Sequence, residues 1–591
     1  MSALPPGVLA LSVRGPADGA VREARAALAA AGVTDPGIHV DAGLVVATWG
    51  GLEPAPDGTL LLSRGPRRHE RDLRVDEVGD LLARRDVASL AEVIAPFAAL
   101  RHLPGGELVA VTDGLGFRHV YHAQWAGRAA VSTSARLLAR LGGSPLDLDA
   151  ITLQSLLGWQ VGDATLFSGV TKLAAGTLVH LADGRLALER APVRDLGPLA
   201  LDDAVDAAAD LLRTHLTAYV EDHPDAVVQL TGGQDSRILL SAVPPALRVG
   251  LGAMTLRVPG SPDSDIAADI AVRSRLRHHV EELTDLATLP PADALEACLV
   301  ASARLEQMAD PVALAGLTMA EAHVDQGHRI AGLGGEVARG FYYLGNPRDT
   351  TVTRAKVARL TSWRMFANEA IDPAALREEL RRDARERAVE RIHDLMAATG
   401  KEWLAATDDF YLEQRMQRWA GVTDTAVCLD RSMVNPMLDD RFIAIAQALS
   451  PESKRGSRFL ARLQMALDPE LGRLPLDGRP PPEAYAEPGL RNRVRSARTL
   501  ARKAAVKARQ RIGHDTRPPA GGAVLAGKVV QQWRREPALL RAALVHDVLD
   551  EAWIERVAAG EVDPAPSTVA FVLNLAALGA DHDVASAAPL Q

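Results

Sequence analysis

The chain has 591 residues, a formal net charge of -9 at pH 7 and 47% hydrophobic residues. This length exceeds what one hydrophobic core usually supports, and the charge lacks the basic excess typical of proteins that bind nucleic acid. No apolar run reaches the roughly 18 residues that span a membrane, the N-terminus lacks the pattern of a secretion signal, and the two cysteines, Cys298 and Cys428, lie too far apart in sequence to indicate a zinc cluster. We therefore expect a cytoplasmic protein of at least two domains, with no nucleic-acid or membrane partner.

The first third of the chain carries short apolar stretches separated by Gly, Pro and Asp turns. This spacing predicts stacked antiparallel sheets with a few helices. The strand candidates are Ile38–Val40, Gly43–Thr48, Leu108–Thr112, His119–His122 and Thr177–Leu181. Pro192 and Gly197-Pro198 mark a boundary near residue 195, so we expect one domain over residues 1–195 and a second over residues 196–591.

Beyond this boundary, longer helical patterns alternate with brief strands, which favours an α/β domain with a parallel sheet. Apolar residues recur at helical spacing from Leu201 to Ala218. A β-branched run and a second apolar run then flank a glycine-rich turn, which predicts a strand, a loop and the start of a helix. The loop and the residue before it are Leu230, Thr231, Gly232, Gly233, Gln234, Asp235 and Ser236.

The chemistry of this loop favours a nucleotide with magnesium. Adjacent glycines let backbone N–H groups approach an anion, and the start of a helix favours negative charge there. Asp235 would repel a phosphate unless a divalent cation lay between them. A solvated glycine turn is the alternative, and the flanking strand and helix patterns disfavour it.

More motifs follow along the chain. The strand candidate Leu251–Arg257 precedes a Pro-Gly-Ser-Pro-Asp turn that ends at Asp263, and residues 330–340 contain three glycines and Glu336 before Gly340. Nine arginines and lysines lie between residues 491 and 511, a composition that predicts a solvated helix or a mobile segment. Contact with an acidic peptide or a partner protein is the alternative for this basic segment.

The loop Thr231–Ser236 resembles the pyrophosphate loop, Ser-Gly-Gly-x-Asp-Ser, of ATP pyrophosphatases. Its surroundings, over about residues 200–485, are similar to the asparagine synthetase family, which has comparable Pro-Gly-Ser-Pro-Asp, Gly-x-Gly-Ser-Asp-Glu, Pro-Phe-Leu-Asp and Leu-Pro-x-x-x-Arg landmarks. The last two correspond to 435–439 and 474–479. This resemblance implies a parallel-sheet ATP pyrophosphatase fold of the adenine nucleotide α-hydrolase type, with ATP bound by Leu230, the loop 231–236, Leu256 and Gly332.

The same resemblance implies a magnesium ion held by Asp235 and Glu336. An ungapped alignment places Gly332, Gly334 and Gly335 on the family's Gly, Gly and Ser, and places Glu336 on its metal-binding Asp. A longer carboxylate can still bind magnesium directly or through water. An exposed loop acid is the alternative for Glu336.

Residues 111–121, 132–134 and 165–176 resemble the glutaminase domain of these enzymes, an α+β sandwich of the Ntn type. In the family this domain begins with a cysteine that removal of Met1 exposes. Here residue 2 is serine and no cysteine precedes Cys298, and serine is a far weaker nucleophile. A degenerate glutaminase domain implies that the amine comes from the substrate itself, as in β-lactam synthetases and lasso peptide cyclases.

Segment 409–421 is similar to the Phe-Tyr-Leu-x-x-Arg-x-x-x-Trp helix of actinobacterial lasso peptide cyclases. A helix that only packs, with Phe410, Leu412, Met416 and Trp419 partly buried, is the structural alternative. Leu333 stands where β-lactam synthetases carry a tyrosine, and a proline run, Pro480–Pro482, stands where the family has a lysine near its Leu-Pro-x-x-x-Arg landmark. The resemblance therefore favours a lasso peptide cyclase over a β-lactam synthetase.

Such a cyclase would use ATP to adenylate an Asp or Glu side chain of a ribosomal peptide. The N-terminal amine of the peptide would then capture the activated carboxyl group, giving a macrolactam with an isopeptide bond, AMP and pyrophosphate, and Glu413 is a candidate base for this step. The implied partners are a precursor core peptide, a leader peptidase and a leader-recognition protein. The alternatives are an ammonia-dependent asparagine synthetase or a β-lactam synthetase-like ligase and, in another class, a catalytically inactive peptide-binding scaffold.

Overall fold

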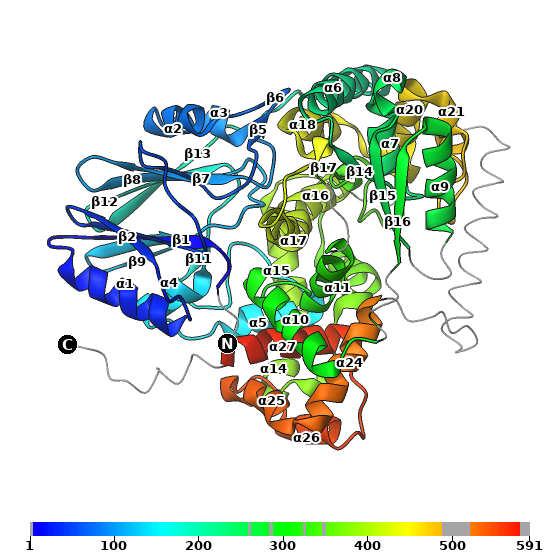
Figure 1. Cartoon of the computed structure of the whole chain (residues 1–591). Helices are drawn as coiled ribbons and strands as arrows, with labels where there is room; N and C mark the ends of the chain where they lie inside the picture. The colour runs from blue at the N-terminus through cyan, green and yellow to red at the C-terminus, as the bar shows by residue number, and fades with distance from the viewer. Residues whose placement is uncertain are drawn as a thin grey trace.

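A computed structural model of the chain (Figure 1) describes residues 4–257, 262–282, 286, 288–322, 327–345, 350–486 and 521–579. Ser2, residues 259–261 of the Pro-Gly-Ser-Pro-Asp turn and the basic segment 491–511 lie outside the described residues. Within the described part of the chain, no helix has both the length and the apolar character needed to cross a membrane.

The N-terminal part contains the expected antiparallel sheets. The six-stranded sheet has the order β11-β9-β10-β1-β3-β2, from Thr171–Lys172, Tyr121–Trp125, Arg128–Ser132, Gly7–Val13, Leu44–Trp49 and Gly37–Asp41. The five-stranded sheet has the order β13-β12-β8-β7-β4, from Arg185–Arg190, Thr177–Ala182, Glu107–Thr112, Ala98–Leu103 and Thr59–Leu61. A short pair, β5-β6, is formed by Arg67–Arg68 and Arg71–Asp72.

Helices cover the outer faces of both sheets and give a four-layer sandwich. The helices α1 (Asp18–Ala30) and α4 (Ala135–Gly142) pack on the six-stranded sheet, and α2 (Val75–Ala83) and α3 (Val87–Ala91) pack on the five-stranded sheet. Because side chains alternate along a strand, Val8 and Ala10 of β1 enter the core between the sheets, whereas Leu9 and Leu11 enter the core beneath α1. This double burial explains why β1 has an apolar sequence without alternation.

The second part contains the expected parallel sheet, with the order β16-β15-β14-β17-β18. Its strands are Arg277–Glu282, Gly252–Arg257, Val227–Gln229, Arg329–Ile330 and Met433–Val434. The predicted helix from Leu201 forms as α6 (Leu201–Asp222), and α7 (Asp235–Ala242) follows β14. Figure 1 shows α7, α8 (Pro245–Arg248), α9 (Asp263–Ser274) and α20 (Arg458–Leu467) on the side of this sheet away from the antiparallel sheets, and α6 at its top, beside β6.

A long helix joins the two parts. It runs through α16 (Trp403–Phe410), a π-helical segment η5 (Tyr411–Ala420) and α17 (Gly421–Cys428), and it lies between the antiparallel and the parallel sheets in Figure 1. The predicted helix over 409–421 is therefore present, with a wider turn than expected. Phe410, Leu412 and Met416 are buried as the structural alternative requires, whereas Trp419 is 36% exposed.

The remaining helices fill the space around these units. In the first part, α5 (Leu148–Leu157) remains. In the second part they are α8 (Pro245–Arg248), α9 (Asp263–Ser274), α10 (Pro291–Arg304), α11 (Pro311–Glu321), α12 (Arg354–Leu360), η3 (Thr361–Met365), α13 (Phe366–Glu369), α14 (Glu378–Arg381), α15 (Ala384–Ala398), α18 (Asp440–Ala448), α19 (Pro451–Lys454), α20 (Arg458–Leu467), α21 (Pro469–Gly472) and α22 (Glu483–Ala486). Single 3-10 turns are η2 (Gly335–Ala338), η4 (Pro373–Ala375), η6 (Pro436–Leu438), η7 (Arg455–Ser457) and η8 (Ala542–His546).

The C-terminal helices α24 (Gly521–Arg535), α25 (Pro537–Arg541), α26 (Glu551–Ala558) and α27 (Pro566–Gly579) gather at one end of the molecule (Figure 1). They pack with α10 and α11. Their apolar side chains belong to the same hydrophobic core as Leu9 and Leu11 of the six-stranded sheet. One core therefore contains residues from both sides of residue 195.

Candidate active site

The order of the parallel strands positions the site. From β14, the chain adds β15 and β16 on one side and then β17 and β18 on the other, so the direction of winding reverses between β14 and β17. In open parallel sheets a crevice forms outside the carboxyl ends of the two strands at such a reversal, and ligands bind there. The glycine-rich loop follows β14, and the segment that contains Glu336 follows β17, so both predicted motifs reach this crevice.

Hydroxyl groups hold the loop after β14 in place. Thr231 Oγ1 lies 3.0 Å from Ser236 Oγ, and the backbone N–H of Gly233 donates to Thr231 Oγ1 at 3.1 Å. The backbone N–H of Thr231 donates to Ser236 Oγ at 3.1 Å. These bonds explain why both ends of the loop carry hydroxyl residues. They also leave the side chains of Gln234 and Asp235 at the start of α7, beside the crevice.

Asp235 and Glu336 lie side by side on one arginine. Arg339 approaches Glu336 Oε1 at 2.7 Å and Asp235 Oδ2 at 3.6 Å. The second oxygens, Asp235 Oδ1 and Glu336 Oε2, are buried and have no hydrogen-bond partner among the described residues. Burial, together with the negative charge of Glu336, raises the pKa of Asp235 to about 7, although Arg339 and Arg479 oppose this shift. One guanidinium does not neutralise both carboxylates, so this pair matches a site for a divalent cation.

Glycines permit the close approach of the two motifs. A side chain at Gly335 would place its Cβ 2.3 Å from Asp235 Oδ1, and one at Gly332 would lie 3.0 Å from the backbone nitrogen of Ser236. Gly334 has φ +110°, a conformation that L side chains rarely adopt, and a Cβ there would lie 2.8 Å from Met437 O. The segment after β17 therefore packs directly against the loop after β14.

A cavity of about 340 Å³ opens at this point. Gln234 lies in its wall with a 2% exposed side chain, and neither amide atom has a hydrogen-bond partner among the described residues. Buried amides are normally paired, so this side chain is available to a ligand. The other charged and polar side chains around the cavity are Gln229, Thr231, Asp235, Ser236, Arg329, Glu336, Arg339, Thr423, Asp424, Asn435 and Arg479.

Asn435 and Asp424 hold the glycine segment, residues 332–335 after β17, in place. Asn435 follows β18, accepts a hydrogen bond from the backbone N–H of Leu333 at 3.3 Å and donates to Asp424 at 2.7 Å. Burial raises the pKa of Asp424 to about 7. The motif 435–439 thus has a positioning role that its sequence does not reveal. In the sequence, Asp424 is only an acidic residue in an apolar helix, and nothing there indicates that it lies at the cavity.

Arg237 connects the loop to the distant segment 471–479. Its guanidinium is fully buried and donates to the backbone carbonyls of Leu474 and Pro475, both at 2.7 Å. The N–H of Asp477 donates to Gly232 O at 3.1 Å, which completes the docking. Arg479 at the end of this segment therefore reaches the cavity wall. In the sequence, Arg237 is visible only as a single basic residue at the start of an apolar run.

The structure brings most of the predicted nucleotide-binding residues together, but not all of them. Thr231, Gly233, Gln234, Asp235, Ser236, Gly332 and Glu336 line the cavity. Leu230 is buried in a core beneath the sheet, Gly232 donates its N–H to Asp263 Oδ1 at 2.9 Å, and Leu256 lies within β15 opposite Glu281. None of these last three lines the cavity.

Glu413 lies in a second cavity, of about 560 Å³, between the antiparallel sheets and the second part. Partial burial and the nearby Asp409 raise its pKa. Lys172, which is 2% exposed, and the exposed side chain of Arg190 also line this space. The helix that passes through η5 and α17 contributes to both cavities, with Glu413 and Gln417 at one and Thr423 and Asp424 at the other.

The polar residues of η5 attach this helix to the N-terminal part. Gln414 accepts from Gly162 N at 2.6 Å, Gln417 donates to Leu115 O at 2.8 Å and Arg418 donates to Ala164 O at 2.5 Å. Arg418 is fully buried, and burial lowers its pKa to about 10. Segment 409–421 therefore has a structural role at the junction of the two parts.

We expect the substitution Glu413→Gln to leave the affinity for Mg-ATP within about two-fold of the wild type, because sites in separate cavities usually act independently. If Glu413 acts as a base, the same variant slows only the capture of the activated carboxyl group. Isothermal titration measures the binding of Mg-ATP, and a pyrophosphate-release assay measures the adenylation that precedes capture. A large loss of ATP affinity would contradict the separation of Glu413 from the cavity that Asp235 and Glu336 line.

No protein-family model matches this chain, and no curated protein is significantly similar to it.

Proposed function

We propose that this protein is an ATP-dependent ligase that activates a carboxylate by adenylation. The observation that carries the proposal is the pairing of Asp235 and Glu336, whose buried second oxygens have no partner among the described residues, at the winding reversal of a parallel sheet. The glycine-rich loop that carries Asp235 resembles a pyrophosphate loop, with Thr231 in place of the first serine. A carboxylate pair beside a phosphate loop has a clear chemical use when a divalent cation joins them.

Asp235 and Glu336 would hold Mg²⁺, and the ion would supply positive charge for the phosphate groups of ATP. Arg339 and Arg479 line the same cavity. We assign to them the neutralisation of the leaving pyrophosphate, in place of the lysine that the asparagine synthetase family has near its Leu-Pro-x-x-x-Arg landmark. Preorganised cations that face a developing charge are among the strongest contributions to catalysis.

The proposed reaction has two steps. An oxygen of the substrate carboxylate bonds to the α-phosphorus of ATP while the bond from that phosphorus to the bridging oxygen of pyrophosphate breaks. A neutral amine then attacks the acyl carbon, the bond to AMP breaks, and the amine proton passes to a base. Positioning both groups in one complex removes much of the entropic cost of the second step.

We propose that the amine and the carboxylate belong to one ribosomal peptide, so that the product is a macrolactam of the lasso type. The resemblance of segment 409–421 to lasso peptide cyclases supports this, as does the four-layer arrangement of the N-terminal part, which fits a degenerate Ntn-type glutaminase domain. The cavity between the two parts offers space for a peptide segment. A core peptide, a leader peptidase and a leader-recognition protein are the proposed partners.

Mass spectrometry tests the proposal directly. A leaderless peptide encoded beside the gene, incubated with the protein and Mg-ATP, is expected to lose one water as AMP and pyrophosphate form. Asparagine formed from aspartate and ammonium would favour the ammonia-dependent alternative. If the protein binds ATP but releases no pyrophosphate from it with any tested peptide, the inactive scaffold is favoured.

The variant Arg479→Met is expected to lower the rate of pyrophosphate release by about 100-fold, because it removes a cation at the developing charge. The control is Arg473→Met in the same segment, where the side chain is 60% exposed and pairs only with Glu483 among the described residues. Stopped-flow detection of pyrophosphate measures both variants. Equal rates for Arg479→Met and the wild type would remove Arg479 from the mechanism.

A further inference from the structure

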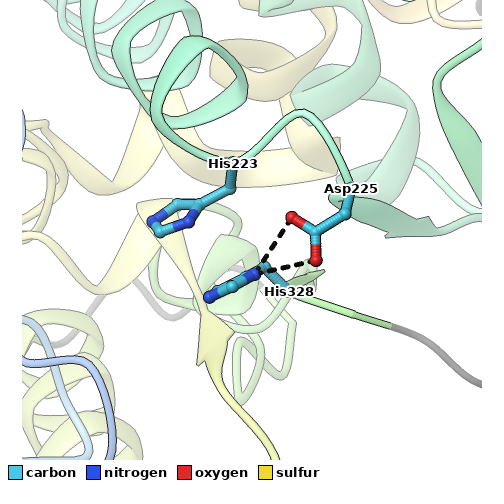
Figure 2. A group of neighbouring side chains, drawn as sticks. All are labelled: His223, Asp225 and His328. Atoms are coloured by element: carbon cyan, nitrogen blue, oxygen red, sulfur yellow. Dashed lines mark hydrogen bonds and ion pairs between the residues drawn. The ribbon is translucent and has the colours of Figure 1, made fainter.

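A cluster of two histidines and an aspartate lies at the amino edge of the parallel sheet, opposite the edge that carries the nucleotide loops (Figure 2). His223 ends α6, Asp225 precedes β14, and His328 precedes β17. Because β14 and β17 pair in parallel, with Val227 opposite Arg329, the residues before the two strands become neighbours. No sequence motif indicates this cluster, since His328 lies more than 100 positions after His223 and Asp225.

The geometry of the cluster is compact. One potential ligand atom from each residue lies within 4.8 Å of the others. His328 Nδ1 lies 3.2 Å from both carboxylate oxygens of Asp225, and the two imidazole rings stack with their centroids 3.9 Å apart. Gly327, with φ +50°, allows the close approach, because a Cβ there would lie 2.7 Å from Asp225 Oδ2.

A carboxylate from the N-terminal part determines which ring nitrogen of His223 carries the proton. Asp72 in β6 lies 2.8 Å from His223 Nε2. A carboxylate acceptor holds the imidazole proton on the nitrogen that it contacts and leaves the lone pair on the other nitrogen, here Nδ1. Histidines that bind metals usually have such a partner, which orients the ring and raises its basicity.

The charges around the cluster favour a cation. Arg67, with a 3% exposed side chain, pairs with Asp72 at 2.8 Å and with Asp222 at 3.0 Å. Asp225 pairs with His328 instead, and in the described part of the chain no lysine or arginine other than Arg67 forms an ion pair with Asp72, Asp222 or Asp225. The three carboxylates therefore outnumber the one guanidinium that pairs with any of them, which favours a bound cation.

We propose that His223, Asp225 and His328 form a binding site for one divalent cation of the zinc type, with Asp72 as a positioning residue. Two imidazoles and a carboxylate suit zinc, with water in the fourth position. Zinc bonds of about 2.0 to 2.1 Å place tetrahedral ligand atoms about 3.4 Å apart. The spacing of 3.2 Å between His328 Nδ1 and Asp225 matches, whereas the two stacked imidazole rings lie 21° from parallel, so one ring has to turn before both nitrogen lone pairs face one ion. The side chain of Asp225 is 58% exposed, so it is able to rotate toward the ion.

Binding requires a lone pair on His328 Nδ1, so the imidazole proton that faces Asp225 would move to Nε2. The ion would join the connection between α6 and β14 to the start of β17, and through Asp72 it would also brace the N-terminal part. Its ligands differ in kind from those of the proposed magnesium site, where the protein donors are carboxylate oxygens. The two sites therefore have different metal preferences, and this inference does not depend on the proposed function.

Cobalt titration tests the proposal, because tetrahedral Co²⁺ with nitrogen ligands absorbs strongly in the visible region. Untagged full-length protein, treated first with a chelator, is expected to bind one equivalent of Co²⁺ with this absorption, and Zn²⁺ is expected to displace it. His223→Gln and His328→Gln are expected to lose the absorption band. Asp72→Asn is expected to weaken Co²⁺ binding by roughly 10-fold to 100-fold.

The matched control is His393→Gln in the cluster of Glu390, His393 and Asp394, whose two acids are exposed. This variant is expected to keep the full band. Circular dichroism shows whether each variant is folded, and a rise in melting temperature with Zn²⁺ in the wild type but not in His328→Gln gives a second readout. The absence of a tetrahedral band in the wild type, or a band that survives in the double variant of His223 and His328, would overturn the proposal.

Discussion

The variant Asp235→Asn is expected to abolish detectable pyrophosphate release and, at the same time, to raise the melting temperature of the protein. Asparagine keeps the shape of the side chain but removes the charge that would hold Mg²⁺, and losses of at least about 100-fold follow the removal of one such group. The gain in stability has a separate cause. Without a cation, Asp235 is a buried carboxylate beside Glu336, and burial and this second charge destabilise its ionised form.

The gain in stability should depend on pH. The pKa of Asp235 is raised from 3.8 to about 7 in the folded protein, so the folded state holds this proton more tightly than the unfolded state does. Its contribution to stability is therefore complete below the unfolded pKa and is lost as pH rises through the folded pKa. The variant should melt above the wild type at about pH 8, and the difference should narrow toward about pH 4.

Differential scanning fluorimetry with and without Mg-ATP measures these effects. Mg-ATP should raise the melting temperature of the wild type, because a ligand stabilises the state that binds it, and should have little effect on Asp235→Asn. The control is Asp265→Asn, whose side chain is 81% exposed and forms an ion pair only with Arg257 among the described residues. Normal pyrophosphate release by Asp235→Asn would contradict both the metal site and the proposed function.

The sequence was sufficient for the features that depend on local patterns. The apolar runs of the first part became antiparallel strands, and the alternating helices and short strands of the second became a parallel sheet. The loop Thr231–Ser236 reaches the crevice because it follows a strand beside the reversal of winding, and the crevice forms outside the carboxyl end of that strand. Local periodicity and turn chemistry decide these features, so one chain is enough to predict them.

Features that depend on distant contacts were beyond the sequence. Arg339 lies three residues after Glu336 in the chain, yet its approach to Asp235 depends on the packing of two loops. The polar residues of segment 409–421 looked like part of a functional motif, but Gln417 and Arg418 bind backbone carbonyls of the N-terminal part. Nothing in the spacing of these residues indicates which carbonyls they meet.

The asparagine synthetase pattern that this segment resembles has Ser and Asp at the positions of Gly335 and Glu336, and the packing gives a physical reason for both differences. A serine at Gly335 would meet Asp235 Oδ1 at 2.3 Å from its Cβ, so glycine is the residue that fits the present position of Asp235. The longer side chain of Glu336 reaches Arg339 at 2.7 Å. The two differences act at the same place. Gly335 lets the glycine segment approach the loop, and Glu336 keeps a carboxylate beside Asp235.

The variant Arg237→Met is expected to lower stability and weaken ATP binding together. Methionine fills a similar volume but leaves the carbonyls of Leu474 and Pro475 without their donor. A hydrogen bond to a charged group contributes about 1.5 kcal/mol or more, so the loss of two amounts to about 3 kcal/mol. Segment 471–479 should detach from the loop and carry Arg479 away from the cavity, which weakens ATP binding by about tenfold, or 1.4 kcal/mol.

Hydrogen exchange followed by mass spectrometry measures the local effect. Backbone amides of 471–479 should exchange faster in Arg237→Met, above all Asp477, whose N–H donates to Gly232 O. Arg473→Met, on the exposed side of the same segment, should leave exchange unchanged, because surface ion pairs contribute little. If the segment stays protected while ATP binding falls, Arg237 acts on the nucleotide by another route. If both stay as in the wild type, Arg237 does not hold segment 471–479 against the loop, and the proposed route from Arg237 to Arg479 is wrong.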